Sequence, residues 1–222
     1  MNHFKTTKGI EFIHAQENKK IEDVSEAIQS KREEELKEAL QKNDIDVYSM
    51  FDDYVMVGDS RILGFESYGL LPSSRILAGT GYTVEKIDES LEAVQSLQPK
   101  NIYISYGAND MAWELGDMKD GYGKLFEKQV KKILKVCPHS KIYVLSIIPA
   151  TASLTDSSSN WARYKNYNQQ LEKMCKRNQW KFIDCSSLAQ DGQADIYQED
   201  GFHFVREFYD EWAMKMMEAT LK

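Results

Sequence analysis

Cysteine is scarce in this chain, and its spacing argues against two common kinds of site. The 222 residues include 3 cysteines, none in the paired CxxC spacing of a zinc site or a redox motif. An odd number of thiols cannot all pair within one chain, which favours a reducing compartment or free thiols. We interpret the cysteines as small core residues; they are Cys137, Cys175 and Cys185.

Long apolar runs are also missing. No stretch approaches the roughly 20 apolar residues needed to cross a bilayer, and residues 1–20 are polar rather than an apolar signal core. We therefore expect a soluble chain, as written, without a transmembrane segment. Two origins stay open: a soluble protein, or the extracytoplasmic soluble part of a secreted or membrane-anchored protein. The sequence makes no prediction of oligomeric state.

Basic residues are outnumbered, with 28 Lys and Arg against 35 Asp and Glu, for a formal net charge of -7. Nucleic-acid binding usually rests on clustered Lys and Arg that neutralise phosphates, so we expect no nucleic-acid partner. Short basic runs at 131–132 and 176–177 fall inside predicted helices, where they indicate a solvated face. No cluster of His, Cys and carboxylates suggests a metal, and we predict no cofactor.

The chain does contain enough apolar and aromatic residues for one sizeable core. Hydrophobic residues make up 42% of the sequence, and its length suits one α/β domain with a short extension. Residues 21–43 are dense in Glu, Lys, Gln and Ala without Gly or Pro, which predicts a charged helix with a thin apolar stripe. We therefore divide the chain into a charged helical N-terminal extension, residues 1–50, and one domain, residues 51–222.

Beyond residue 53, short apolar runs alternate with longer amphipathic stretches. The apolar runs predict strands at 54–57, 74–77, 101–105, 141–148 and 181–183. The amphipathic stretches predict helices at 84–97, 122–136, 161–177 and about 206–221. This alternation indicates right-handed βαβ units, and hence an α/β fold whose parallel sheet is covered by helices on both faces.

Residues capable of chemistry gather at the ends of these elements. They follow the first and third strands and precede the last helix, in segments 58–60, 107–110 and 200–203. In a parallel sheet such loops meet at the carboxyl edge. A serine hydroxyl is a poor nucleophile unless a base lies within hydrogen-bond reach and a carboxylate orients that base. Ser60 can be the nucleophile, His203 the base and Asp200 the orienting carboxylate.

Acyl transfer also needs hydrogen-bond donors for the oxyanion that develops on the attacked carbonyl. Three candidates are the backbone N–H of Ser60, the N–H of Gly79 and the side-chain amide of Asn109. Glycine suits such a position because it allows close approach of the backbone to a substrate. Gly81, two residues further on, is an alternative to Gly79.

Two other carboxylates adjoin these residues and have a structural interpretation. Asp59 and Asp110 are expected to fix loops by accepting hydrogen bonds from nearby backbone N–H groups. Three aromatic residues near the predicted edge, Tyr106, Trp113 and Trp161, either line a pocket there or belong to the core.

Four short blocks resemble those of the SGNH, or GDSL-like, hydrolases. They read VGDS at 57–60, AGTG at 78–81, YGAND at 106–110 and DGFH at 200–203, and they occur in the family's order. The resemblance extends from Phe51 to the C-terminus. Two departures stand out. Position 61 is Arg where the namesake motif has Leu, and residues 21–53 have no counterpart in the catalytic core of the family.

The resemblance implies a flavodoxin-like, three-layer α/β/α sandwich with a central parallel sheet, and ester hydrolysis without a metal. It also implies that residues 51–222 are the catalytic domain. Ser60, Asp200 and His203 would be the catalytic triad, and Ser60, Gly79 and Asn109 the oxyanion hole.

The resulting hypothesis is a serine esterase that works through an acyl-enzyme. The expected substrate is a small acyl ester, acetyl in the first instance, carried by a small molecule, a carbohydrate or a cell-wall glycan. Two alternatives stay open: an O-acyltransferase with the same triad, and a non-catalytic binding module on the same fold.

Overall fold

A computed structural model describes residues 31, 34, 35, 38, 39, 42, 45–117, 121–189 and 194–220. Val47–Ala219 form one compact unit. Of the predicted charged helix at 21–43, the five described residues from 31 to 39 are helical, and most of the remainder lies outside the described residues. The division of the chain between residues 50 and 51 stays a prediction.

The compact unit is built on a five-stranded sheet in the order β2-β1-β3-β4-β5, and every neighbouring pair is parallel. Its strands are β1 (Tyr54–Gly58), β2 (Ile76–Ala78), β3 (Asn101–Ser105), β4 (Lys141–Leu145) and β5 (Lys181–Ile183). The order reverses at β1, which lies between β2 and β3. The loops that leave β1 and β3 therefore start side by side at the carboxyl edge of the sheet, where ligands bind in open α/β folds.

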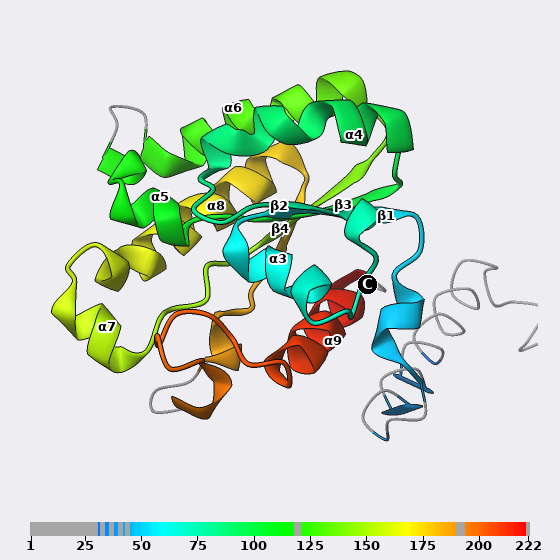
Figure 1. Cartoon of the computed structure of the whole chain (residues 1–222). Helices are drawn as coiled ribbons and strands as arrows, with labels where there is room; N and C mark the ends of the chain where they lie inside the picture. The colour runs from blue at the N-terminus through cyan, green and yellow to red at the C-terminus, as the bar shows by residue number, and fades with distance from the viewer. Residues whose placement is uncertain are drawn as a thin grey trace, which may run out of the picture. The chain divides into compact units, whose positions relative to one another are not determined.

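Helices cover both faces of this sheet, and the expected three-layer α/β/α sandwich is confirmed (Figure 1). One face carries α4 (Leu91–Leu97), α6 (Gly121–Val136) and α8 (Tyr164–Asn178), and the other carries α3 (Ser60–Ser67) and α9 (Phe208–Thr220). Two shorter helices, α5 (Ala108–Ala112) and α7 (Ala152–Ser157), lie in loops beyond the strands. The 3-10 helices are η1 (Val47–Met50), η2 (Ser73–Arg75), η3 (Val84–Ser90), η4 (Leu115–Asp117), η5 (Trp161–Arg163), η6 (Ser186–Leu188) and η7 (Ala194–Ile196).

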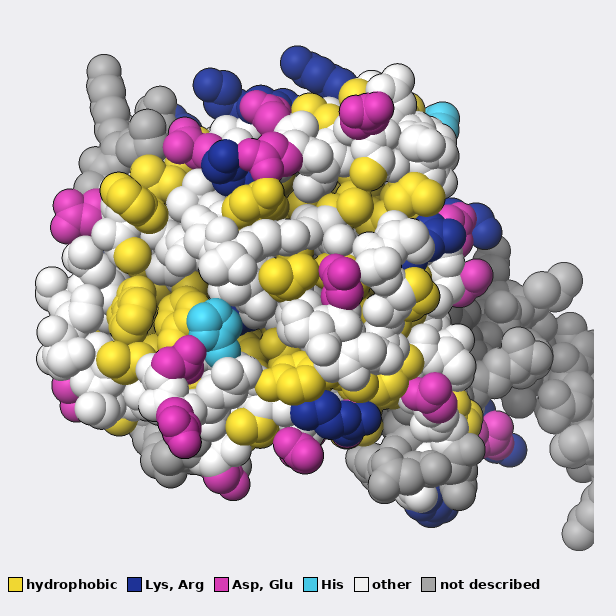
Figure 2. Space-filling model, in the orientation of Figure 1, with side chains coloured by type: hydrophobic (Ala, Val, Ile, Leu, Met, Phe, Trp, Pro, Cys, Tyr) yellow, Lys and Arg dark blue, Asp and Glu magenta, His cyan; other side chains and the backbone are white. Residues whose placement is uncertain are grey.

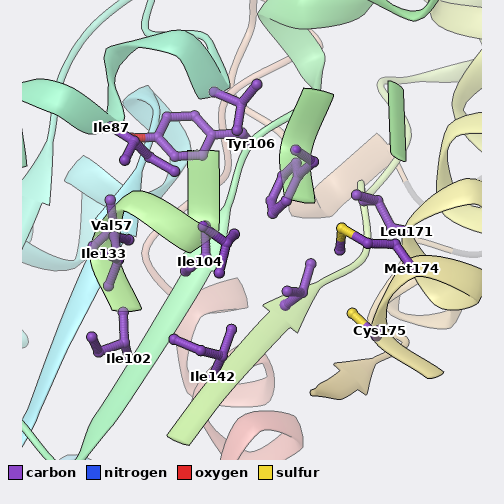
Figure 3. Packing of buried hydrophobic residues seen from close by; sticks show 14 of the residues in the cluster. Val57, Ile87, Ile102, Ile104, Tyr106, Ile133, Ile142, Leu171, Met174 and Cys175 are labelled. Atoms are coloured by element: carbon purple, nitrogen blue, oxygen red, sulfur yellow. The ribbon is translucent and has the colours of Figure 1, made fainter. Parts of the chain in front are cut away.

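Strand side chains alternate between the two layers, as the two-residue repeat of a strand requires. Ile102 and Ile104 of β3 belong to the hydrophobic cluster under α4, α6 and α8 (Figure 3). Tyr103, between them, points the other way and stacks on Tyr143 of β4, with ring centroids 4.9 Å apart. All five residues of β1 are buried, which explains why its sequence is continuously apolar.

The opposite layer is mainly aromatic. Phe65 of α3 packs against Tyr209 and Trp212 of α9, with ring centroids 4.8 and 5.5 Å away. Edge-to-face and tilted pairs of this kind add stabilisation beyond the area they bury. The contact joins the helix that begins at Ser60 to the last helix of the chain. The predicted core cysteines are buried as expected.

The strands and helices predicted beyond residue 53 are all present, but their ends differ. The predicted helix at 84–97 consists of η3 followed by α4, and the Ser- and Thr-rich loop at 151–160 contains α7. The predicted strand at 141–148 ends at Leu145. It ends there because the Asn168 side chain accepts the Ile147 N–H at 2.7 Å and donates to the Ile147 carbonyl at 2.9 Å, in place of a neighbouring strand.

None of the helices in the described ranges is long and apolar enough to cross a bilayer.

The double hydrogen bond of Asn168 is expected to stabilise the end of β4. Asn168→Ala leaves both polar groups of a buried backbone residue without their partner, so we expect the free energy of unfolding to fall by about 2 kcal/mol. Urea unfolding followed by circular dichroism measures this. The control is Gln169→Ala on the exposed face of the same helix, which should change stability by less than about 0.5 kcal/mol. Equal effects of the two substitutions would contradict the assignment.

Candidate active site

Ser60 reaches the carboxyl edge of the sheet through a tight strand-to-helix turn. Strand β1 ends at Gly58, where an added Cβ would lie 2.6 Å from the Ser105 carbonyl oxygen, so the close approach of β3 requires glycine. Asp59 is the N-cap of α3, and its carboxylate accepts the Arg61 N–H at 3.0 Å. The predicted loop-fixing role of Asp59 is confirmed. Ser60 is the first residue of the helix, directly beyond the strand.

The structure brings His203 and Asp200 to Ser60, although 143 residues separate His203 from Ser60 in the sequence. His203 Nε2 lies 2.9 Å from Ser60 Oγ, and His203 Nδ1 lies 2.5 Å from Asp200 Oδ2. A carboxylate can only accept a hydrogen bond, so Nδ1 carries the proton and Nε2 is free to accept from the serine hydroxyl. The three predicted residues therefore form one continuous chain of hydrogen bonds.

Asp200 is itself held in place by its own loop. Its Oδ1 accepts the backbone N–H groups of Phe202 at 2.8 Å and of His203 at 2.9 Å. Partial burial raises the pKa of Asp200, but the bonds from the His203 ring and from these two N–H groups outweigh burial and leave the pKa below its usual value. The carboxylate is thus kept ionised beside the imidazole.

Asn109 lies in the first turn of α5, after β3. The turn into this helix passes through Gly107 at φ 140°, a backbone conformation that side chains rarely permit. Asn109 Nδ2 donates to the Tyr82 carbonyl at 2.9 Å. An amide nitrogen has two hydrogens, so one remains for a ligand. The neighbouring Asp110 accepts the Val84 N–H at 2.9 Å, which confirms its predicted loop-fixing role.

The loop after β2 contains both glycines considered as oxyanion donors, Gly79 and Gly81, and their backbones differ. The Gly79 N–H points to the Gly58 carbonyl at 3.4 Å and so continues the pairing of β1 with β2. The Gly79 N–H is thus directed at the neighbouring strand, and its role in the oxyanion hole stays a prediction. Gly81, at φ 74°, lies at the exposed tip of the turn that the Tyr82 N–H closes on the Gly79 carbonyl. The geometry therefore favours the alternative donor, Gly81.

Aromatic side chains flank His203. The Phe202 ring packs edge-on against the imidazole, with centroids 5.0 Å apart, and Trp161 packs on Phe202 at 5.2 Å. Figure 2 shows hydrophobic side chains gathered around a histidine on the face in view. Trp113, after α5, is 73% exposed, whereas Tyr106 is buried in the core. Of the three aromatic residues considered from the sequence, Trp161 lies beside the predicted site and Tyr106 belongs to the core.

An open cleft of about 710 Å³ extends from Asp200 along α7 and the loop that follows β4. Its walls include Thr151, Leu154, Tyr164 and Tyr197, so it offers both hydroxyl and apolar surface. Of the three hydrogen-bonded residues, Asp200 lines this cleft.

Two buried carboxyl groups lie under these loops. Burial raises the pKa of Asp110 to about 7, although the hydrogen bond from the Val84 N–H lowers it somewhat. Burial also raises the pKa of Asp59 to about 6, and the nearby Arg61 guanidinium and the Arg61 N–H oppose that rise. Both carboxyl groups hold the loops around Ser60 and Asn109 by hydrogen bonds, although burial disfavours their charged form.

Arg61 is the residue whose contribution the sequence did not predict. The chain departs from the namesake motif at this position, yet the side chain is 4% exposed and contacts the loop that carries His203. The available signal was an arginine directly after Ser60 and before the apolar residues Ile62 and Leu63.

The parallel sheet and its helices define the fold class, and the sequence identifies the family of the chain. A sequence model of the GDSL-like lipase/acylhydrolase family matches residues 65–210, and the chain belongs to that family. It is accordingly a carboxylic ester hydrolase. The matched range includes Asn109, Asp200 and His203 and begins shortly after Ser60. Comparison with curated protein sequences finds no match.

Solved structures share the fold. A GDSL-like lipase from Bacteroides thetaiotaomicron is 17% identical, with a TM-score of 0.57, over 78% of this chain and 92% of that one. A family 3 carbohydrate esterase from Clostridium thermocellum is 16% identical, with a TM-score of 0.56, over 74% and 92%. A mutant acetyl-xylooligosaccharide esterase from Geobacillus is 14% identical, with a TM-score of 0.54, over 75% and 92%.

The buried acid at Asp110 predicts a pH-dependent stability. The pKa of about 7 in the folded chain exceeds the value near 4 of an unfolded chain, so the folded state keeps a proton that the unfolded state releases between these values. The stabilisation from that proton is complete below about pH 4 and is lost as the pH rises to about 7. Asp110→Asn removes this titration and retains an oxygen that can accept the Val84 N–H.

We therefore expect the stability of Asp110→Asn, relative to the unsubstituted chain, to increase by roughly 2–4 kcal/mol between pH 4 and pH 8. Urea midpoints across this range measure the difference. Asp156→Asn, at an exposed carboxylate, is the control and should show no such trend, because that charge stays in water in both states. A flat difference for Asp110→Asn would contradict the buried acid.

Proposed function

We propose that this chain is a serine esterase that hydrolyses small acyl esters through an acyl-enzyme. Ser60 is the nucleophile, His203 the acid-base group and Asp200 the orienting carboxylate. The observation that carries the proposal is the hydrogen-bonded chain of 2.9 Å from Ser60 Oγ to His203 Nε2 and 2.5 Å from His203 Nδ1 to Asp200. This arrangement supplies both requirements of an activated serine, a base in reach and a carboxylate behind it.

The reaction follows from the direction of these bonds. Ser60 Oγ attacks the ester carbonyl carbon while His203 Nε2 accepts the hydroxyl proton, and the imidazolium is stabilised by Asp200. His203 then donates this proton to the leaving alkoxide oxygen, which departs as the alcohol and leaves the acyl group on Ser60. A water molecule attacks the acyl-enzyme with His203 again as the base, and the acid and free Ser60 are released.

The proposed mechanism also needs hydrogen-bond donors for the oxyanion that forms on the attacked carbonyl. The Ser60 N–H is the first of α3, and the first N–H groups of a helix have no acceptor within it. The Gly81 N–H lies at the tip of its turn, and Asn109 retains one amide hydrogen beyond its bond to Tyr82. We propose these three as the oxyanion hole, with Gly81 in the place first assigned to Gly79. Donors held by helix and loop hydrogen bonds need little reorganisation during the reaction.

For the substrate we propose an acetyl ester of a carbohydrate, or of a cell-wall glycan. Trp161 packs on Phe202, which contacts the His203 ring, and a flat apolar ring such as that of Trp161 suits the apolar face of a sugar. The cleft beyond Asp200 has room for further sugar units. The carbohydrate esterases among structures of the same fold support this choice.

We further propose residues 51–222 as the catalytic domain and residues 1–50 as its extension. The proposed catalytic residues all lie in the compact unit Val47–Ala219. An O-acyltransferase would use the same groups and pass the acyl group to a sugar hydroxyl instead of water. Product analysis with a glycan acceptor separates the two, because transfer in excess of hydrolysis would replace the esterase proposal.

Ser60→Ala tests the nucleophile. We expect kcat with p-nitrophenyl acetate to fall by at least about 10³-fold, because only binding and the oxyanion donors remain. A fluorophosphonate probe should label the unsubstituted chain at Ser60 and leave the variant unlabelled. Ser67→Ala, in the last turn of the same helix, is the control and should retain full activity and labelling. Turnover by folded Ser60→Ala at the original rate would refute the proposal, and with it the alternative transferase.

Asn109→Ala tests the oxyanion hole. Loss of one donor is expected to lower kcat by roughly 10²- to 10³-fold, with a much smaller change in KM, because the donor acts mainly on the transition state. Asn101→Ala is the matched control. Asn101 Nδ2 also bonds a backbone carbonyl, that of Asp52 at 3.1 Å, but at the opposite end of β3. If both variants lose activity equally, Asn109 acts through stability rather than through the oxyanion.

A further inference from the structure

The Arg61 side chain connects the helix that begins at Ser60 to the loop that carries His203. It belongs to α3, directly after Ser60, and its guanidinium bonds three backbone carbonyls from two other segments. Nε donates to Phe202 at 3.1 Å, one terminal nitrogen donates to Ile148, and the other donates to Pro149 at 3.5 Å. Phe202 immediately precedes His203 in the chain, so this bond holds the residue next to His203.

Two aromatic rings enclose the same guanidinium. Its central carbon lies 4.3 Å from the centroid of the Phe202 ring and 4.6 Å from that of the Phe204 ring. These residues immediately precede and follow His203. A cation between ring faces is attracted by both, and the attraction is stronger away from water. Arg61 thus holds the His203 loop by a backbone carbonyl and by the side chains on either side of the histidine.

Leucine, the residue of the namesake motif, has no donor for any of these carbonyls. A buried arginine is costly unless its charge and its N–H groups are satisfied. Arg61 meets that requirement with carbonyl oxygens and ring faces, and its charge is also close to the buried carboxylate of Asp59. The groups arranged around it come from the start of α3, the loop after β4 and the His203 loop, the segments whose relative position sets the contact between Ser60 and His203.

We propose that Arg61 is a positioning residue that fixes His203 Nε2 within hydrogen-bond reach of Ser60 Oγ. The inference rests on the proposed function, because it assigns to Arg61 the alignment of that nucleophile and base. Misplacement of a catalytic group by about 1 Å can lower a rate by roughly 10²-fold, so the alignment has a large effect on kcat and little on substrate binding. Arg61 touches neither the substrate nor the reacting atoms.

The decisive variants are Arg61→Met and Arg61→Lys. Met keeps an unbranched, buried side chain without donors, and we expect kcat with p-nitrophenyl acetate to fall about 10- to 100-fold while KM changes less than about 2-fold. The rate of Ser60 labelling by the fluorophosphonate should fall by a similar factor. Lys restores one charged donor but not the fork of a guanidinium, so we expect it to recover part of the lost rate.

Tyr68→Phe is the matched control. Tyr68 caps the other end of α3, and its hydroxyl donates to the Phe204 carbonyl at 3.0 Å, so it also ties this helix to the His203 loop. The Phe204 carbonyl retains a second donor, Gln198 Nε2 at 3.0 Å. We expect a small loss of thermal stability and an unchanged kcat.

The outcomes separate this inference from the proposed function. Absence of Ser60 labelling in the unsubstituted chain would overturn the proposed function itself. Normal labelling there, combined with an unchanged kcat in folded Arg61→Met, would overturn only the positioning role, even if the melting temperature falls. Should Arg61→Met fail to fold, Arg61→Lys decides: a kcat equal to that of the unsubstituted chain overturns the inference, and a reduced kcat at unchanged KM supports it.

Discussion

The parallel sheet is the constraint on which the rest of this structure depends. All paired strands run the same way, so the segments that leave β1 and β3 do so at one edge. The order reverses at β1, and this places the turn at Ser60 beside the turn at Asn109. No local interaction joins these turns in the sequence. Their proximity follows from strand pairing, and the chemistry at the edge is available only while that pairing holds.

Side chains from one loop then hold the backbone of another. Asn109 bonds the Tyr82 carbonyl, Asp110 bonds the Val84 N–H, and Arg61 bonds carbonyls of two other segments. Loops without regular pairing must satisfy their polar groups in this way when they are buried. These hydrogen bonds fix the positions of the loops at the carboxyl edge of the sheet without extending the strands. They also offset part of the desolvation cost of the buried Asp and Arg side chains.

Asp200 likewise holds a loop in place while it contacts His203. Asp200 uses one carboxylate oxygen to organise its own loop and the other to orient His203. The imidazole is therefore positioned from its own loop by Asp200 and, on our proposal, from α3 through Arg61. The Phe202 ring packs against one side of the imidazole, and an open cleft begins at Asp200.

The sequence by itself determined the alternation of strands and helices, the three-layer architecture, and the residues that meet at the carboxyl edge. These features leave local patterns: apolar runs of strand length, amphipathic helices, and polar blocks at element ends. The tertiary structure alone decided that the Gly79 N–H turns into the sheet, that β4 ends where Asn168 bonds Ile147, and that Arg61 reaches the loop of His203. Those contacts join residues 21 to 141 positions apart, and a hydrogen bond between such distant groups imposes no periodicity or composition on the chain around either of them.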